Sequence, residues 1–238
     1  MSKESYLEQL MATMTPEKKA SAKNDWFAFY VGRPMSYLLT VPFLKANIEP
    51  NVVSLISLLE VIIAGLCVST APTREVAILG VLLFFLWNLL DGVDGNIARL
   101  KHMHSQLGST WDATSGYAAM FLTFFSMGCY AGRESSVWIV LGSLSAMFTL
   151  FPRLVMHKAK SEGISNAGSL ANKAQYGFFR ILALNMTSTT GLIQPFMLVA
   201  VLFKWETIFT SAYFVLNFLI MIISMYKIFK GSLSKNVR

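Results

Sequence analysis

Charge is scarce in this sequence, and so are cysteine and aspartate. Only 14% of the 238 residues are charged, whereas 54% are hydrophobic, a balance that argues against a soluble globular domain. Both cysteines, Cys67 and Cys129, lie in apolar segments, so we expect neither a disulfide framework nor a zinc site. The net charge of +7 comes from basic residues spread over loops and ends, which argues against nucleic acid as a partner.

Long apolar runs dominate the sequence instead. Several are about 20 residues long, the length needed to cross about 30 Å of hydrocarbon. We therefore predict an all-α polytopic membrane protein with six transmembrane helices, preceded by an N-terminal interfacial amphipathic helix. The expected spans cover approximately residues 51–70, 74–99, 109–130, 137–158, 189–203 and 205–226.

The same pattern divides the chain into three parts. Residues 1–49 are predicted to be a cytosolic segment that contains the interfacial helix, where Pro34 and Pro42 argue against one straight helix. Residues 50–230 are the predicted six-helix transmembrane domain, which carries the candidate catalytic site. Residues 231–238 are the predicted cytosolic tail.

The distribution of basic residues predicts the orientation. Six spans place both termini on one side of the membrane. Of the 20 lysines and arginines, only Arg74, Arg133 and Lys204 then fall on the opposite side. The positive-inside rule therefore predicts an integral protein of the cytoplasmic or inner membrane, with the aspartate-rich stretch and both termini facing the cytosol.

Three of the four aspartates, Asp91, Asp94 and Asp112, fall within residues 88–117. Carboxylates at the edge of a bilayer are costly, so this cluster points to a function rather than to solvation of helix ends. The chain turns between two predicted spans here, which brings Asp112 back towards the other two. Three carboxylates without cysteine, and without a histidine at ligand spacing, select an oxygen-loving ion such as Mg²⁺ or Mn²⁺.

The neighbouring residues suit a phosphorylated ligand. Helical spacing places Asp91, Asp94, Gly95 and Ala98 on one face. Gly95 and Ala98 leave that face nearly bare, so a ligand can approach the backbone. Arg99 follows directly and is suited to a phosphate. A divalent metal beside a phosphate indicates phosphoryl transfer.

This stretch closely resembles the signature of the CDP-alcohol phosphotransferases, also called CDP-alcohol phosphatidyltransferases. The matching pattern is Asp91-x-x-Asp94-Gly95-x-x-Ala98-Arg99 and, after eight residues, Gly108-x-x-x-Asp112. The resemblance extends to the opening Pro50-Asn51-Val52-Val53-Ser54 and to the six expected spans.

The resemblance implies an activity. Such enzymes transfer a phosphoalcohol group from a CDP-alcohol, such as CDP-diacylglycerol, to a hydroxyl acceptor and release CMP, in phospholipid or related phosphodiester synthesis. It also implies homodimers and a two-metal centre of Mg²⁺ or Mn²⁺. By resemblance, the metal ligands would be Asp91, Asp94 and Asp112, the CDP pocket would be lined by Gly95, Ala98 and Arg99, and Gly108 would permit close approach of helices.

The resemblance breaks at one position. The family pattern ends in Asp-x-x-x-Asp, but the residue four positions after Asp112 is Gly116. The last aspartate normally completes the metal site and is the proposed base for the acceptor hydroxyl. Three explanations are open. Another base, such as His102, His104 or Glu60, replaces it; an engineered substitution has removed it; or the protein is a natural pseudoenzyme that binds a CDP-alcohol or lipid.

Basic residues close the fourth predicted span. Arg153 and Lys158 either anchor this span on the cytosolic side or form a pocket for a phosphorylated acceptor or an anionic head group. A transporter would need polar residues along a path through several helices, and the apolar segments offer little beyond Glu60. Glycines such as Gly128 and Gly142 are expected to allow close contact between helices.

Overall fold

The structure is a computed structural model, and it describes residues 5–103, 105–133, 135–163 and 176–233. All regular elements within these ranges are helices, in agreement with the predicted fold class. They are α1 (Tyr6–Ala12), α2 (Pro16–Ala22), the π-helical turn η1 (Ala28–Gly32), α3 (Arg33–Lys45), α4 (Pro50–Ser69), α5 (Arg74–Leu100), α6 (Gln106–Ala131), α7 (Val137–Ser161), α8 (Phe178–Thr187), α9 (Ile193–Phe203) and α10 (Glu206–Leu233).

Four of these helices are long and apolar enough to cross a membrane: α4, α5, α7 and α10. The sequence predicts six spans, and the two others correspond to α6 and α9. Helix α6 has 26 residues, but small and hydroxyl-bearing residues interrupt its apolar pattern, and it is not among the helices apolar enough for a crossing. Helix α9 has only 11 residues, which is shorter than a membrane crossing requires. The number of spans therefore stays a prediction beyond these four.

Glycine sets the spacing of the long helices. A Cβ atom added at Gly128 in α6 would lie 2.7 Å from the Cα of Gly142 in α7. A Cβ at Gly80 in α5 would lie 2.9 Å from the backbone nitrogen of Val68 in α4. Side chains at these positions would force the backbones apart, so the expected role of the glycines in helix contact is confirmed.

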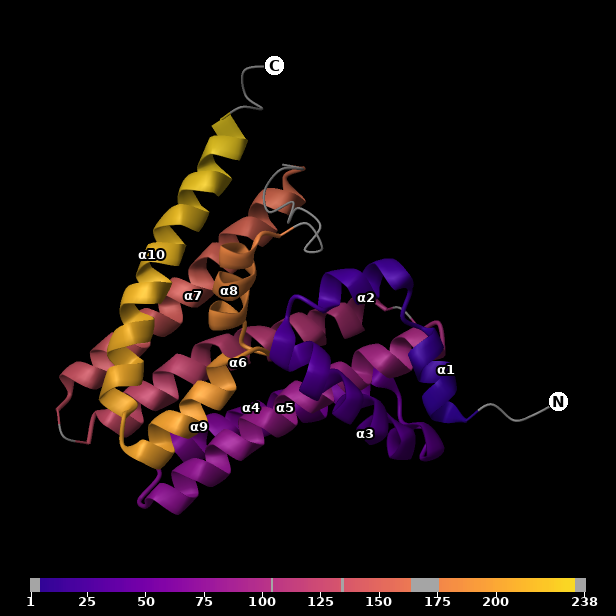
Figure 1. Cartoon of the computed structure of the whole chain (residues 1–238), viewed down its shortest axis with the longest axis horizontal. Coiled ribbons are helices and arrows are strands. Elements are labelled where there is room, and N and C mark those ends of the chain that lie inside the picture. The colour runs from indigo at the N-terminus through magenta and orange to yellow at the C-terminus, as the bar shows by residue number, and fades with distance from the viewer. Residues whose placement is uncertain (1–4, 104, 134, 164–175, 234–238) are drawn as a thin grey trace.

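The main core lies between α4, α5, α6, α9 and α10. Phe84 and Trp87 of α5 and Phe124 of α6 are its largest fully buried side chains. Figure 1 shows α7 and α10 packed along each other, with the N-terminal helices α1 to α3 at the other end of the molecule. Of these, α1 and α3 pack against α5, the helix that carries Asp91 and Asp94.

The N-terminal segment forms short helices rather than one. Pro34 comes shortly after the π-helical turn η1, and the chain stays helical across it into α3. Helix α3 continues through Pro42, so this proline does not end it. Gly92 of α5 lets α3 approach closely, because a Cβ there would lie 2.8 Å from the Cβ of Ser36. Asn96 of α5 fixes the contact by donating to the hydroxyl of Thr40 (3.0 Å).

Candidate functional site

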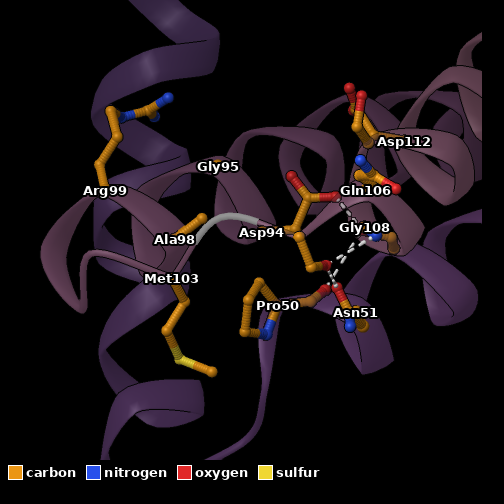
Figure 2. A pocket seen from close by; sticks show the side chains of 13 residues that line it. Pro50, Asn51, Asp94, Gly95, Ala98, Arg99, Met103, Gln106, Gly108 and Asp112 are labelled. Atoms are coloured by element: carbon orange, nitrogen blue, oxygen red, sulfur yellow. Dashed lines mark hydrogen bonds between the residues drawn. The ribbon is translucent and has the colours of Figure 1, made fainter.

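A pocket of about 520 Å³ lies where the end of α5 meets the beginnings of α4 and α6. Figure 2 shows side chains from all three helices converging on it. Its lining includes Pro50, Asn51 and Ser54 of α4, Asp94, Gly95, Ala98 and Arg99 of α5, and Gln106, Gly108, Ser109 and Asp112 of α6. The structure thus joins most of the residues that the sequence singled out.

One face of α5 forms the floor of the pocket. Asp94 is buried there, and Gly95 leaves room for Arg99, whose Nη1 lies 3.1 Å from where a Cβ of residue 95 would be. Arg99 also donates a hydrogen bond from Nη2 to the Oδ1 of Asn96 (2.8 Å). The guanidinium is therefore held back over its own helix at the rim of the pocket.

Ser54 of α4 orients the buried carboxylate. Its hydroxyl donates to the Oδ2 of Asp94, and both groups are removed from solvent. This contact fixes the orientation of the Asp94 carboxylate at the pocket. No local pattern in the sequence indicates this role for Ser54, although the residue ends the Pro50-Asn51-Val52-Val53-Ser54 opening.

We expect Ser54→Ala to weaken Mg²⁺ binding at this pocket by about tenfold, the usual cost of losing a group that orients a metal ligand. The measurement is a titration of Mg²⁺ against thermal unfolding of the purified protein. Ser57→Ala is the matched control, because the Ser57 hydroxyl contacts Ser115 (2.9 Å) rather than Asp94. Equal Mg²⁺ affinity in the wild type and Ser54→Ala would contradict an orienting role.

The start of α6 is joined tightly to α4 at Gly108. A Cβ at this position would lie 2.5 Å from the Oδ1 of Asn51, so only glycine fits without a shift. The backbone N–H of Gly108 donates to the hydroxyl of Ser105 (2.9 Å), which in turn donates to Asn51 (3.2 Å). Close helix approach at Gly108 places Asp112, one turn later, at the pocket.

The three aspartates do not play equal parts in the geometry. Asp94 and Asp112 both line the pocket, and Asp112 is exposed. Asp91 does not line it, although the charges of Asp94 and Asp112 act on Asp91. Within the described residues, no three His, Cys, Asp or Glu side chains lie close enough together to hold one metal ion.

Gly116 occupies open space. A Cβ added there meets no atom within 4 Å, so the position of the absent aspartate could hold a side chain. Its neighbours are engaged elsewhere. Ser115 is buried and accepts a hydrogen bond from the indole N–H of Trp87 (2.8 Å), and the Tyr117 hydroxyl is 2.6 Å from Nδ1 of His157 in α7. The Tyr117–His157 pair was not anticipated from the sequence.

Of the suggested replacement bases, the two within the described residues, His102 and Glu60, do not line the pocket. His102 is exposed in the turn after α5, and His104 lies outside the described residues. Glu60 lies in the middle of α4, where both carboxylate oxygens are buried without a hydrogen-bond partner in the described part of the chain. Within the described residues, neither His102 nor Glu60 is therefore placed to stand in for an aspartate at position 116.

The two basic residues proposed to bind the acceptor lie elsewhere. Arg153 and Lys158 are exposed on the last turns of α7, and neither lines the pocket. Lys158 forms an ion pair with Glu162 four residues later. Acceptor binding by these residues stays a prediction.

Comparison with known proteins gives the site a context. Residues 47–226 match the family model of CDP-alcohol phosphatidyltransferase. An uncharacterized protein of Aquifex aeolicus is 24% identical over 172 residues, which cover 72% of this chain and 84% of that protein. A phosphatidylinositol phosphate synthase of Cutibacterium acnes is 28% identical over 147 residues, which cover 60% of this chain and 69% of that protein.

Proposed function

The chain belongs to the CDP-alcohol phosphatidyltransferase family, and from this premise we propose that it transfers a phosphoalcohol group from a CDP-alcohol to a hydroxyl acceptor. The proposed donor is a lipid such as CDP-diacylglycerol. The acceptor hydroxyl attacks the phosphorus that carries the donor alcohol, the bond to CMP breaks, and a phosphodiester forms. The similarity to a phosphatidylinositol phosphate synthase supports a role in phospholipid synthesis.

The observation that carries this proposal is the pocket at the end of α5. It combines two carboxylates, Asp94 and Asp112, with the guanidinium of Arg99 and the bare surface of Gly95 and Ala98. A diphosphate needs positive charge and close access to the backbone, and a nucleotide needs a cleft of this size. We assign Gly95, Ala98 and Arg99 to the CDP group and Gly108 to the approach of α6.

We further propose that Asp91, Asp94 and Asp112 hold Mg²⁺ or Mn²⁺. The three carboxylates act on one another electrostatically, and none forms an ion pair within the described residues. Carboxylate oxygens are the ligands that suit a hard divalent cation. When bound, the metal would neutralise charge on the diphosphate. Asp91 must turn towards the pocket to take part, while Ser54 keeps Asp94 in place.

Orientation and assembly complete the proposal. The basic residues predict that the pocket and both termini face the cytosol, and we propose a homodimer as the working form. Arg153 and Lys158 are proposed to hold an acceptor that carries a phosphate or lies near anionic lipid, with Lys158 released from Glu162 when it does so.

A second candidate function follows from Gly116. Without a base, the acceptor proton has no assigned destination in the described pocket, so the protein would bind a CDP-alcohol or lipid without turning it over. The open space at Gly116 favours this candidate as much as it favours a slow enzyme. Loss of a general base commonly costs about 10²–10⁴-fold in rate.

The test uses the full-length protein in detergent or lipid nanodiscs with CDP-diacylglycerol. CMP release is measured with Mg²⁺, with Mn²⁺ and with EDTA, across a panel of hydroxyl acceptors that includes inositol phosphate and glycerol phosphate. The proposal expects metal-dependent CMP release that needs an acceptor. Metal-dependent binding of the donor without CMP release would establish the second candidate, and absence of both would refute the site.

A further inference from the structure

A second cavity, of about 330 Å³, shares Arg99 in its lining with the first. Its lining comes from the segment of α1 and α2, from the start of α3 and from the end of α5. The residues that matter here are Lys18 and Ser21 of α2, Arg33 and Tyr37 of α3, and Arg99 of α5. Arg99 lines both cavities, so it forms the wall between them.

The charges around this cavity are all positive. Lys18, Arg33 and Arg99 line it, and no aspartate or glutamate does so. Within the described part of the chain, none of the three forms an ion pair with a carboxylate. Arg33 and Arg99 act on each other electrostatically, and like charges at this range repel. An anion between them would relieve that repulsion.

Arg33 provides the second observation. Its Nε is buried, yet it has no hydrogen-bond partner among the described residues. A buried donor without a partner is costly, and a guanidinium that faces a cavity is suited to forked contact with phosphate oxygens. Polar groups for further contacts, the hydroxyls of Ser21 and Tyr37, lie in the same lining.

We propose that this second cavity binds a phosphate-bearing anion, held by Lys18, Arg33 and Arg99. The cavity is separate from the pocket assigned to the CDP-alcohol, because Lys18 and Arg33 do not line that pocket. Two sources share the required chemistry: a free phosphate or phosphomonoester, and the phosphate of an anionic phospholipid. Helix α2 and the turn before it form one wall. They belong to residues 1–49, the predicted cytosolic segment that contains the interfacial helix, so both sources are within reach.

The first arm of the test uses purified full-length protein in neutral detergent with EDTA. Inorganic phosphate is titrated against chloride at matched ionic strength, and the midpoint of thermal unfolding is followed by tryptophan fluorescence. The wild type should show saturable stabilisation. Lys18→Gln or Arg33→Gln should weaken the apparent phosphate affinity about tenfold or more, as expected for one charge-assisted contact.

Lys19→Gln is the matched control, because Lys19 is exposed on the same helix and does not line the cavity. It should bind phosphate like the wild type. Should Arg33→Gln fail to fold, Lys18→Gln still tests the proposal. Lys18 is exposed on the short helix α2, so its substitution should leave the fold intact.

The second arm separates the two sources. Nanodiscs of phosphatidylcholine are compared with nanodiscs that also contain phosphatidylglycerol. A lipid phosphate is the ligand if phosphatidylglycerol stabilises the wild type and Lys19→Gln but not the cavity variants, while free phosphate has no effect. The proposal is overturned if all four proteins respond equally to both probes, or if none responds to either. The readout is binding alone, so an inactive transferase would not affect the result.

Discussion

Asp112→Ala is expected to abolish metal-dependent binding of a CDP-alcohol. Asp112 is exposed at the pocket and makes no hydrogen bond or ion pair with the rest of the described chain, so its removal should leave the fold intact. Loss of an orienting group costs about 10–100-fold in metal affinity. Loss of a direct ligand should therefore lower the metal affinity by more than about a hundredfold. The measurement is the affinity for CDP as Mg²⁺ is titrated.

The control for this variant is Thr114→Ala. Thr114 is exposed on the same helix, and its hydroxyl bonds only to the backbone oxygen of Thr110 (2.7 Å). This variant should bind CDP and Mg²⁺ as the wild type does.

Asp91→Ala tests the residue that does not line the pocket, and we expect it to lose metal-dependent binding too. Unchanged CDP affinity in both aspartate variants would remove the metal assignment.

Gly116→Asp is expected to raise CMP release by about 10²–10⁴-fold, the contribution typical of a general base. The structure accepts the new side chain, because a Cβ at residue 116 meets nothing within 4 Å. Position 116 also follows Asp112 by four residues on α6, which places both on one face of the helix. The measurement is the initial rate of CMP release from CDP-diacylglycerol at saturating Mg²⁺.

Gly116→Asn is the matched control. Asparagine has the same shape as aspartate but cannot take up the proton of the acceptor hydroxyl. A gain with aspartate alone would show that an otherwise competent site lacks its base. A wild type that is already fast, with no gain in either variant, would show that another base is used. Donor binding without CMP release even in Gly116→Asp would establish the silent binding protein.

The spacing of apolar residues along the chain was enough to predict the long helices. The predicted boundaries of the spans that correspond to α4 and α5, 51–70 and 74–99, differ by one residue at most from the helices Pro50–Ser69 and Arg74–Leu100. Apolar runs and terminal polar residues mark such helices plainly. The N-terminal segment was harder, because its prolines suggest breaks and α3 nevertheless continues through Pro42. Packing against α5 outweighs the local preference there.

In the candidate site, too, local spacing predicts some features and packing between helices decides others. The face formed by Asp94, Gly95 and Ala98 follows from helical periodicity, and the structure places all three in one pocket. The contact between Ser54 and Asp94 joins residues 40 positions apart, so no local pattern reveals it. Residue type alone suggests His102 and Glu60 as replacement bases, and neither lines the pocket.

By itself, the sequence determined that this chain is helical, apolar and built around acidic residues at the end of one long helix. These properties depend on composition and on spacing within single helices, and both can be read directly from the order of residues. Only the tertiary structure decided that Asp91 does not line the pocket, that Gly116 faces open space, and that Lys18, Arg33 and Arg99 line one cavity. Those facts depend on how separate helices pack, and packing is set by contacts between residues far apart in the chain.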